Sequence, residues 1–181
     1  MHPVMTLRES RAQTTFRALA AALAYPGRRQ RLPADGPQAF YAIADSLVDL
    51  ESSYTTNDRE LDALFGPLGG RRLAVAEAHY QFYPTLQPFE LIELREAPVG
   101  TYLYPDRSAT LVLGCRFELG VLLHLTGPGI QDVVDIDVSG IPDDFWMLRA
   151  SACAYPLGWD VFLVSGDEVI GLPRTTRVEV A

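Results

Sequence analysis

The stretch Pro156–Val180 reads PLGWDVFLVSGDEVIGLPRTTRVEV and decides how the rest of the chain is interpreted. Trp159–Val164 is dense in β-branched and aromatic residues, and an apolar run, Val169–Leu172, follows the polar turn Ser165–Glu168. Two such runs around a polar turn predict a β-hairpin. Pro173 has no backbone donor, so regular strand pairing is expected to weaken there.

Directly beyond this hairpin lie Arg174, Thr175, Thr176 and Arg177. Guanidinium groups next to hydroxyls suit a phosphate or the carboxylates of a partner protein, so the four residues are the candidate contact for an anion or a partner. Arginine and threonine at a strand end serve equally well to solvate an exposed edge. Both interpretations stay open on the residues alone.

Helices and strands alternate along the rest of the chain. The residues around 10–25 indicate a helix, as do 37–51 and 142–153. The apolar positions at helical spacing in the first of these helices are Ala12, Phe16, Leu19, Ala20 and Leu23. Central strands are expected at 110–113 and 121–125, a half-exposed strand at 134–138, and further strands at 53–56 and 73–78. The pattern predicts an α/β fold, a mixed sheet with helices on its faces.

Length and charge limit the classes of protein to consider. The 181 residues fit one domain spanning 1–181, whose first nine residues are expected to be loosely ordered. A formal charge of −8 argues against binding to a nucleic-acid backbone. No apolar run approaches the ~20 residues that cross a bilayer, which argues against a membrane partner. The first residues lack a signal-peptide layout, so a cytoplasmic location is expected.

The chain contains no lysine, and all fifteen of its basic residues are arginine. An internal aldimine with pyridoxal phosphate requires a lysine amine, and a Walker-type P-loop requires its own lysine. The sequence therefore excludes both enzyme classes, and no cofactor is expected. Cys115 and Cys153 fit no metal-ligand spacing and are expected to be reduced.

No complete catalytic or metal-binding set is visible in the sequence. His124 lies within an apolar run, which favours a packed histidine over a ligand. A triad of Cys115, His124 and an aspartate can be assembled on paper, but no local motif supports it. Asp132, Asp135 and Asp137 have the spacing of a solvated strand edge more than that of a cation site. We therefore assign no catalytic and no metal residue.

Gly127-Pro128-Gly129 follows a buried run and has two interpretations. Glycine allows backbone N–H groups to approach an anion, so Gly127 and Gly129 are candidates for a turn or an anion contact. Pro128 removes one donor, and a strand rather than a helix follows. A tight turn with positive φ is the favoured interpretation.

Several blocks of this sequence resemble those of the PhnH family, the H subunits of bacterial carbon–phosphorus (C-P) lyase systems. The most specific block contains Pro156-Leu157-Gly158, Asp160 and Leu172–Thr176. The other blocks are Phe16-Arg17, Pro26-Gly27, Leu125–Ile130, Gly100-Thr101 and Pro105. They occur in the family's order along nearly the whole chain, whereas the residues 68–95 match poorly.

The resemblance implies a fold like that of pyridoxal-phosphate-dependent transferases without the cofactor. It also implies a cytoplasmic subunit of an assembly with G, I and J subunits, which forms a homodimer when isolated. That assembly couples a phosphonate to ribose triphosphate, making ribose 1-methylphosphonate 5-triphosphate, before the carbon–phosphorus bond is broken. The family has no catalytic residues to transfer to this chain.

The expected function is therefore that of a non-catalytic, accessory subunit in phosphonate catabolism, with no complete active site of its own. The alternative is a stand-alone small enzyme or binding domain for a phosphorylated metabolite, acting through Arg174 and Thr175. In the first case the Arg174–Arg177 cluster serves assembly or fold rather than turnover.

Overall fold

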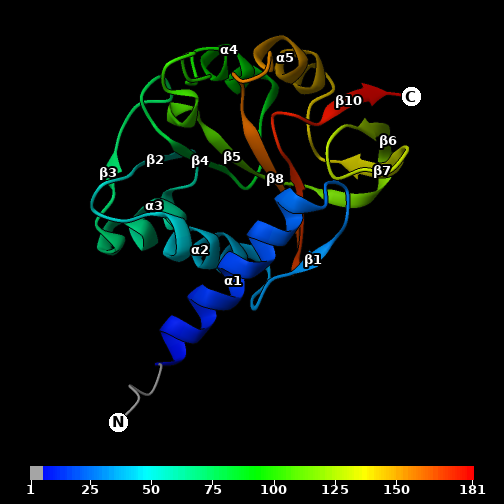
Figure 1. The fold of residues 1–181 in the computed structure, drawn as a ribbon. Helices are drawn as coiled ribbons and strands as arrows, with labels where there is room; N and C mark the ends of the chain where they lie inside the picture. The colour runs from blue at the N-terminus through cyan, green and yellow to red at the C-terminus, as the bar shows by residue number, and fades with distance from the viewer. Residues whose placement is uncertain (1–5) are drawn as a thin grey trace.

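A computed structural model describes residues 6–181. In this part of the chain, helices pack against two β-sheets (Figure 1). The helices are α1 (Leu7–Ala24), α2 (Gly36–Leu47), α3 (Arg59–Phe65), α4 (Leu91–Leu94) and α5 (Asp144–Ala152), with short 3-10 turns η1 (Gly66–Leu68), η2 (Pro88–Glu90) and η3 (Pro105–Arg107). The strands are β1 (Gln30–Arg31), β2 (Ser53–Thr56), β3 (Arg71–Arg72), β4 (Tyr80–Tyr83), β5 (Thr110–Gly114), β6 (Arg116–Thr126), β7 (Val134–Ser139), β8 (Asp160–Ser165), β9 (Glu168–Leu172) and β10 (Arg177–Val180). The prediction of an α/β fold with a mixed sheet is confirmed.

The larger sheet has seven strands in the order β1-β9-β8-β5-β4-β2-β3. From β8 to β3 the neighbours are parallel, and β9 and β1 are added antiparallel at the other side. β5 and β8 are central and buried on both faces, which explains their uninterrupted apolar runs. The expected hairpin is confirmed as β8 and β9, and β9 ends at Leu172, the residue before Pro173.

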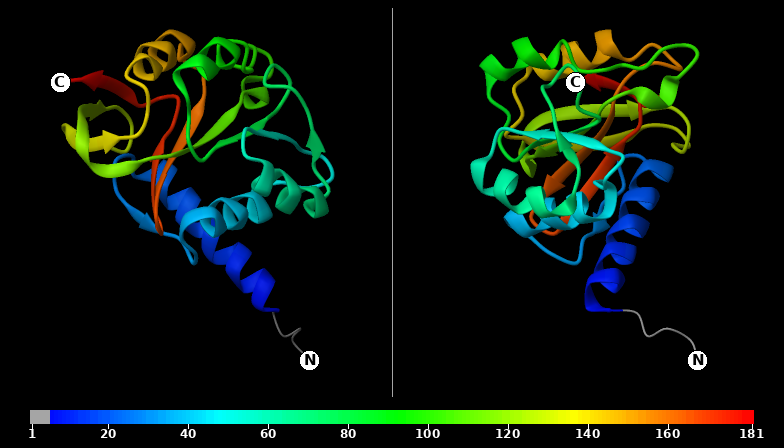
Figure 2. Two further views of the ribbon diagram at one scale, coloured as in Figure 1. Left: turned by 180° about the vertical axis from the view of Figure 1, so that it is seen from behind. Right: turned by 90° about the vertical axis from the view of Figure 1, so that its left-hand side faces the viewer.

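Helices cover both faces of the larger sheet. α1, α2 and α3 lie on one face and α4 and α5 on the other (Figure 2). Each face has its own core: Phe40, Phe65 and Phe82 are buried beneath α1–α3, and Leu111, Leu163 and Trp159 are buried on the α4–α5 side.

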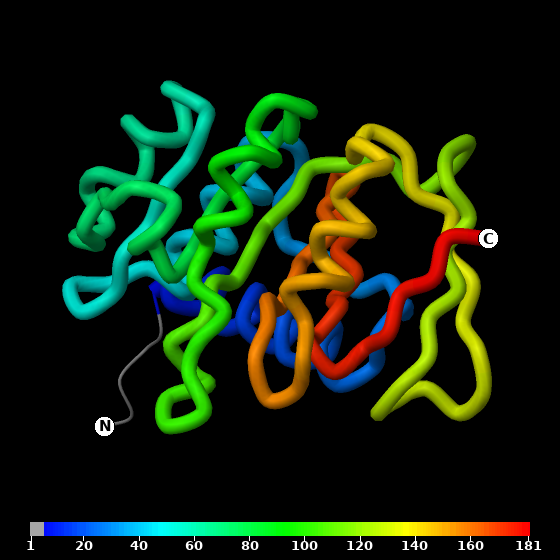
Figure 3. Tube along the Cα trace, turned by 90° about the horizontal axis from the view of Figure 1, so that it is seen from above, coloured from blue at the N-terminus to red at the C-terminus, as the bar shows by residue number. Residues whose placement is uncertain are grey.

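The smaller sheet has three antiparallel strands in the order β10-β6-β7 and stands beside the larger one (Figure 3). Its outer strand β7 alternates buried and exposed residues, with Ile136 and Val138 inward and Asp135 and Asp137 outward. The prediction of a half-exposed strand here is confirmed, because one face of this sheet packs on the α4–α5 core and the other faces solvent.

α1 starts earlier than expected and buries only part of the apolar set noted in the sequence. Thr6 and Glu9 form a reciprocal capping box, so the helix begins at Leu7 rather than near residue 10. The expectation of a loosely ordered start concerns residues 1–5, which lie outside the described residues, and residues 6–9, which form this cap and first turn. Of the apolar positions noted at helical spacing, Leu19 is buried, whereas Phe16 and Ala20 are exposed, and Ala18 and Ala22 complete the buried face.

The close approach of α1 to β9 explains why the side of α1 with Ala18 and Ala22 is buried. A Cβ atom on Gly171 of β9 would lie 2.6 Å from the Ala22 carbonyl carbon. Only a small residue on the helix and a glycine on the strand allow this spacing, so Ala18 and Ala22 determine which side of α1 is buried.

The prediction of a strand at 73–78 is wrong. Those residues form a turn between β3 and β4, in which the Glu77 and Ala78 amides donate to the Ala74 carbonyl. The buried Gln81 side chain donates to the carbonyls of Val75 (2.7 Å) and Ala78 (3.1 Å) and replaces the strand pairing that the turn lacks. Along residues 6–181, every helix is too short or too polar to pass through a bilayer.

Candidate functional site

The segment Pro173–Thr176 carries the chain from the larger sheet to the smaller one. β9 ends at Leu172 beside β8, and β10 begins at Arg177 beside β6, so the candidate cluster from Arg174 to Arg177 lies at the junction of the two sheets. Figure 1 shows this crossing between the end of β9 and β10. The local conformation follows from Pro173, which ends pairing with β8.

Arg174 is held from several sides within the protein. Its backbone N–H donates to Asp160 Oδ1 (2.8 Å), and its Nη2 donates to Asp160 Oδ2 (2.6 Å). Nη1 donates to the Pro105 carbonyl at 2.6 Å and to the Pro156 carbonyl at 3.5 Å. The Arg174 side chain is 17% exposed and that of Asp160 20% exposed. The guanidinium is thus occupied by groups of its own chain.

A second arginine, Arg149 of α5, supports the same segment from inside. Its Nη1 donates to the Thr176 carbonyl (3.0 Å), and its Nη2 donates to the carbonyls of Leu172 (3.2 Å) and Pro173 (2.9 Å). Burial lowers the pKa of this guanidinium from its ordinary value. Sequence reasoning placed Arg149 on the helix without a role. Its one signal was a charged residue on the apolar face formed with Phe145 and Trp146.

The two glycines of the Gly127-Pro128-Gly129 turn pack against main chain. Gly127 has φ +132° and Gly129 φ +85°, which confirms a turn with positive φ. A Cβ atom on Gly127 would lie 2.8 Å from the Thr175 carbonyl oxygen, and one on Gly129 2.6 Å from the Ala24 carbonyl oxygen. Carbonyl oxygens therefore face both glycines. An anion contact at this turn stays a prediction.

The remaining blocks noted in the sequence lie at the same junction. Gly100 (φ +80°) packs against Pro105, whose carbonyl accepts from Arg174. The Gly158 amide donates to the Val99 carbonyl at 3.0 Å. Gly27, after α1, approaches Leu125 and Val134 of the smaller sheet. The blocks at 26–27, 100–105, 125–130, 156–160 and 172–176, far apart in the sequence, thus form one joint between α1, the two sheets and α5.

The four residues of the candidate cluster have different environments in this joint. Thr176 is buried and its carbonyl accepts from Arg149, whereas its buried hydroxyl has no hydrogen-bond partner among residues 6–181. Thr175 is half-buried over Gly127. Arg177 is exposed and forms a surface ion pair with Glu179 (2.8 Å). Of the two arginines, Arg177 is therefore the one at the surface, and contact with an anion or a partner there stays a prediction.

The triad of Cys115, His124 and an aspartate is not assembled. His124 Nδ1 lies 2.7 Å from Asp135 Oδ1 across β6 and β7. Cys115 directly precedes β6 at its other end, far from His124 along the strand. Burial also raises the pKa of the Cys115 thiol to about 12, so it is not a nucleophile at neutral pH. Among residues 6–181, no three His, Cys, Asp or Glu side chains are grouped so as to hold a metal ion.

An apolar face over α4 and α5 was not predicted from the sequence. A hollow of about 1010 Å³ lies between these helices, lined by Leu91, Leu148 and Trp159 among others. Ile92 (70% exposed) and Met147 (72%) line it, and Phe89 (70%) and Tyr155 (78%) are exposed next in sequence to its lining residues Pro88 and Ala154. Figure 3 shows α4 and α5 side by side on this face. We call these four residues and the hollow the α4–α5 face.

Comparison with known proteins connects this architecture to phosphonate metabolism. The model of the family described as "Bacterial phosphonate metabolism protein (PhnH)" matches residues 5–179. HtxG of Stutzerimonas stutzeri, whose name assigns it provisionally as a C-P lyase subunit protein, is 36% identical over 94% of this chain and 87% of its own. The alpha-D-ribose 1-methylphosphonate 5-triphosphate synthase subunit PhnH of Rhizobium meliloti (strain 1021) is 32% identical over 93% of this chain and 90% of its own.

Proposed function

Because the chain belongs to the PhnH family of bacterial phosphonate metabolism proteins, we propose that it is a non-catalytic, accessory subunit of a C-P lyase assembly. In this role it is needed at the stage that forms ribose 1-methylphosphonate 5-triphosphate. The observation that carries the proposal is the match of nearly the whole chain to two relatives whose names describe subunits of such machinery.

The use of the motif residues supports an architectural role. Arg174 donates to the Asp160 carboxylate, and Arg149 donates to the Pro173 carbonyl. Gly127 packs against the main chain at Thr175. A catalytic residue has to reach a substrate, whereas these groups face inward. Their arrangement suits a rigid joint that fixes the two sheets relative to each other.

The α4–α5 face supports a role in assembly. Ile92 and Met147 are exposed in the lining of one hollow, and Phe89 and Tyr155 are exposed next to its lining residues in the sequence; clustered apolar surface is typical of protein–protein interaction sites. Met147 can adapt its shape to a partner, and exposed aromatic residues such as Phe89 and Tyr155 are enriched at interfaces. We infer that another subunit of the assembly covers this face.

The same proposal extends to the partners, the oligomeric state, the location and the fold relationship that the family implies. The partners are the G, I and J subunits, the isolated chain forms a homodimer, and the assembly works in the cytoplasm. The fold is related to that of pyridoxal-phosphate-dependent transferases. Without a lysine, this chain has no amine to hold that cofactor covalently.

Co-expression tests the proposal. The chain is tagged, produced together with the G, I and J subunits of the same organism, and purified through the tag. A stable complex containing all of them is expected, and its synthase activity should fall when this chain is left out. Recovery of the tagged chain alone would argue against an accessory subunit. Synthase activity that is unchanged without it would do the same.

A further inference from the structure

The connections between strands of the larger sheet change direction between β2 and β4. These strands are parallel neighbours, but α3 leads from β2 outward to β3, whereas α4 leads from β4 inward to β5 (Figure 1). α3 lies on one face of the sheet and α4 on the other (Figure 2). Ligands of open α/β sheets bind outside the carboxyl ends of the strands at such a change of direction. The fold therefore marks the carboxyl ends of β2 and β4 as the place for a ligand.

A hollow of about 210 Å³ lies at this place. Thr55 and Thr56 at the end of β2 and Tyr83 at the end of β4 line it, together with Glu90 and Glu93 from the connection between β4 and β5. Its size is below that of a typical pocket for a drug-sized ligand. The hollow therefore suits a small molecule.

Thr55 points a nearly buried hydroxyl to this hollow. Tyr54 packs against Phe65 of α3 with 5.6 Å between the ring centres, so the side chain of Thr55, the next residue of β2, points to the opposite face. Thr55 is 9% exposed, and within residues 6–181 its hydroxyl makes no hydrogen bond. In contrast to the hydroxyl oxygens of Ser108 and Thr176, that of Thr55 is not fully enclosed. A nearly buried hydroxyl without a partner costs stability, so an occupant of the hollow is the expected partner.

The other hydroxyl groups of β2 are used within the chain. Ser53 donates to the Glu77 carbonyl (3.3 Å), and Tyr54 donates to Asp62 (3.4 Å). The Thr56 hydroxyl accepts the Asp58 backbone N–H (3.2 Å). Thr55 therefore differs from its neighbours in keeping its hydrogen-bonding capacity for a group outside the fold.

Tyr83 supplies a second polar group to the hollow. Its hydroxyl donates to Gln81 Oε1 (3.0 Å), so the Tyr83 oxygen can only accept a further hydrogen bond. Burial and the charges of Glu90 and Glu93 raise the pKa of this hydroxyl above its ordinary value, so it stays protonated at neutral pH. Both carboxylates therefore act on the phenol oxygen at the hollow.

The two carboxylates of the hollow have different tasks. Asn57, directly after β2, donates through Nδ2 to the Thr85 carbonyl (2.8 Å) and to Glu90 Oε1 (2.8 Å), and Glu90 Oε2 accepts the Gln87 backbone N–H (2.7 Å). Glu90 thus holds together the loops that follow β2 and β4. Glu93 is exposed and forms an ion pair with none of the arginines in residues 6–181. It is therefore the carboxylate that can accept from a ligand.

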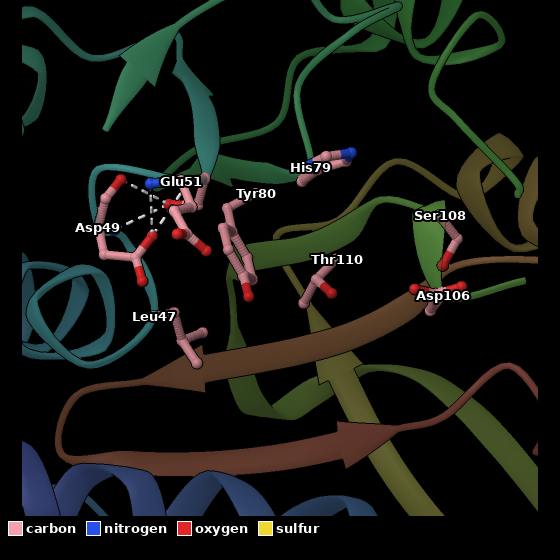
Figure 4. Close-up of a pocket in the computed structure, with 9 residues that line it drawn as sticks. Leu47, Asp49, Glu51, His79, Tyr80, Asp106, Ser108 and Thr110 are labelled. Atoms are coloured by element: carbon pink, nitrogen blue, oxygen red, sulfur yellow. Dashed lines mark hydrogen bonds between the residues drawn. The ribbon is translucent and has the colours of Figure 1, made fainter. Parts of the chain in front are cut away.

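Another hollow, of about 250 Å³, lies at the amino ends of β2, β4 and β5 (Figure 4). Asp49 Oδ1 accepts the backbone N–H groups of Glu51 and Ser52, both at 3.0 Å, and so holds the local turn (Figure 4). The hydroxyl oxygen of Ser108 is fully enclosed. In contrast to Thr55, Ser108 therefore cannot meet an occupant of its hollow.

We propose that the hollow at the carboxyl ends of β2 and β4 binds a small uncharged molecule with neighbouring hydroxyl groups, a polyol or a sugar. Two neighbouring hydroxyls can donate to the two oxygens of the Glu93 carboxylate. A third hydroxyl can bond to Thr55, which donates or accepts, and to the Tyr83 oxygen, which accepts. Hydroxyl groups match this set because each of them can donate and accept.

Charge disfavours the anions of phosphonate metabolism at this place. Arg72 also lines the hollow, but its Nε is paired with Asp62 (2.8 Å), and its register opposite Tyr54 places its side chain on the α3 face. The charges left at the hollow are therefore negative and repel phosphates and phosphonates. Among residues 6–181, no group of three His, Cys, Asp or Glu could hold a metal ion. A polyol site goes beyond the accessory role proposed above and does not depend on it.

Amide NMR on the full 20.0 kDa chain tests the proposal. The probes are xylitol and D-xylose, which present neighbouring hydroxyls on an open chain and on a ring, and 1,5-pentanediol, which has no neighbouring hydroxyls. Xylitol or D-xylose should cause saturable shifts at Thr55, Asn57 and Glu93, and the tighter of the two identifies an open-chain polyol or a sugar ring. Saturable binding of 1,5-pentanediol with equal affinity, or no saturable shift with either hydroxyl-rich probe, would overturn the proposal.

Charged probes separate this ligand class from ions. Sodium glycerol 3-phosphate should cause no saturable shifts at the same amides, because Glu90 and Glu93 repel it. Ethanolamine hydrochloride should bind more weakly than xylitol, since it has one hydroxyl. Tighter binding of either charged probe than of xylitol and D-xylose would show that the hollow is a site for an ion and would overturn the proposal.

Thr55→Val tests the hydroxyl with little change in side-chain shape. It should weaken binding of the better probe about fivefold, as expected for one hydrogen bond. It should not lower the thermal stability, because the Thr55 hydroxyl has no partner to lose within residues 6–181. Thr110→Val changes a threonine of β5 outside this hollow and should leave binding unchanged. Undiminished binding by Thr55→Val, or an equal loss in Thr110→Val, would contradict the proposal.

Glu93→Gln tests the carboxylate. It should weaken binding of the same probe about tenfold, because hydrogen bonds to a charged group are stronger than those between neutral groups. Glu96→Gln removes the same charge from an exposed position outside the hollow and should have no effect. Equal binding by the two variants would contradict the role of Glu93. These measurements use the isolated chain, so their failure leaves the accessory-subunit proposal untouched, and failure of the co-expression test does not affect them.

Discussion

Arg174 and Asp160 connect the two ends of the β8–β9 hairpin, because Asp160 is the first residue of β8 and Arg174 lies two residues beyond the end of β9. The Asp160 carboxylate accepts the Arg174 backbone N–H at 2.8 Å and Nη2 at 2.6 Å. The same guanidinium reaches the Pro105 carbonyl, so one side chain links three segments of the chain. This contact is the centre of the joint between the sheets.

Removing Arg174 should therefore destabilise the fold. We expect Arg174→Ala to lower the free energy of unfolding by about 2–3 kcal/mol, because it leaves the partly buried Asp160 carboxylate without its charged partner. Arg177→Ala is the matched control from the same cluster. Its exposed pair with Glu179 should contribute no more than about 1 kcal/mol. Urea unfolding measures both variants, and equal losses would contradict the internal role of Arg174.

Arg149 should be needed for the attachment of β10. Arg149→Met keeps much of the side-chain volume but removes the guanidinium hydrogen bonds to the carbonyls of Leu172, Pro173 and Thr176, so we expect a loss of at least about 2 kcal/mol. Hydrogen exchange should become faster at the β10 amides that pair with β6. Unchanged protection of β10 would show that Arg149 does not support this strand.

Glycine substitutions test the close approach at the joint. Gly127→Ala and Gly129→Ala should each destabilise the protein by about 1–3 kcal/mol, since both have positive φ and an added Cβ would meet a carbonyl oxygen. Gly66→Ala is the control, because a Cβ atom at this position would have no neighbour within 4 Å and the φ of Gly66 is −47°. Its effect should be neutral or stabilising by up to about 1 kcal/mol. Thermal unfolding distinguishes these outcomes.

The partly buried Cys115 thiol predicts a specific alkaline destabilisation. Its pKa is raised to about 12 in the folded protein, against about 8.5 in an unfolded chain. A raised pKa stabilises the fold below about pH 8.5, and that contribution is lost as the pH rises from about 8.5 to 12. The free energy of unfolding should fall by up to about 1.4 kcal/mol per pH unit in this range more steeply than in Cys115→Ala. Parallel pH profiles of the two proteins would contradict this.

Local patterns were sufficient to predict the β8–β9 hairpin and β7 but not the contacts of the side chains around them. The β8–β9 hairpin and the alternating strand β7 follow from residue types that are adjacent in the sequence. The inward role of Arg174 was not predictable, because its partners at 105, 156 and 160 come from distant segments. Whether Arg174 meets solvent or its own chain depends on that three-dimensional arrangement.

At Phe16 and at residues 73–78, tertiary contacts override the local sequence pattern. Helical spacing groups Phe16 with Leu19, and the contact of Ala22 with Gly171 selects a face of α1 that contains Leu19 and leaves Phe16 exposed. The turn at 73–78 contains strand-like residues, and hydrogen bonds from Gln81 override that preference. Likewise Ile92 and Met147 look like core residues in the sequence, and packing alone reveals that they are exposed.

The α4–α5 face can be tested within the assembly by exchanging apolar side chains for charges. Ile92→Glu combined with Met147→Glu should leave the isolated chain as stable as the natural protein to within about 0.5 kcal/mol, because both side chains are exposed. Val133→Glu places one such charge at an exposed apolar position directly before β7 and is the control.

The most direct measurement is the yield of the G, I and J subunits that co-purify with each tagged variant. The double variant Ile92→Glu/Met147→Glu should lose these partners, while Val133→Glu and the natural chain retain them. Recovery of the full complex by the double variant at the natural yield, or absence of the partners from the natural chain itself, would contradict an accessory subunit that docks through its α4–α5 face.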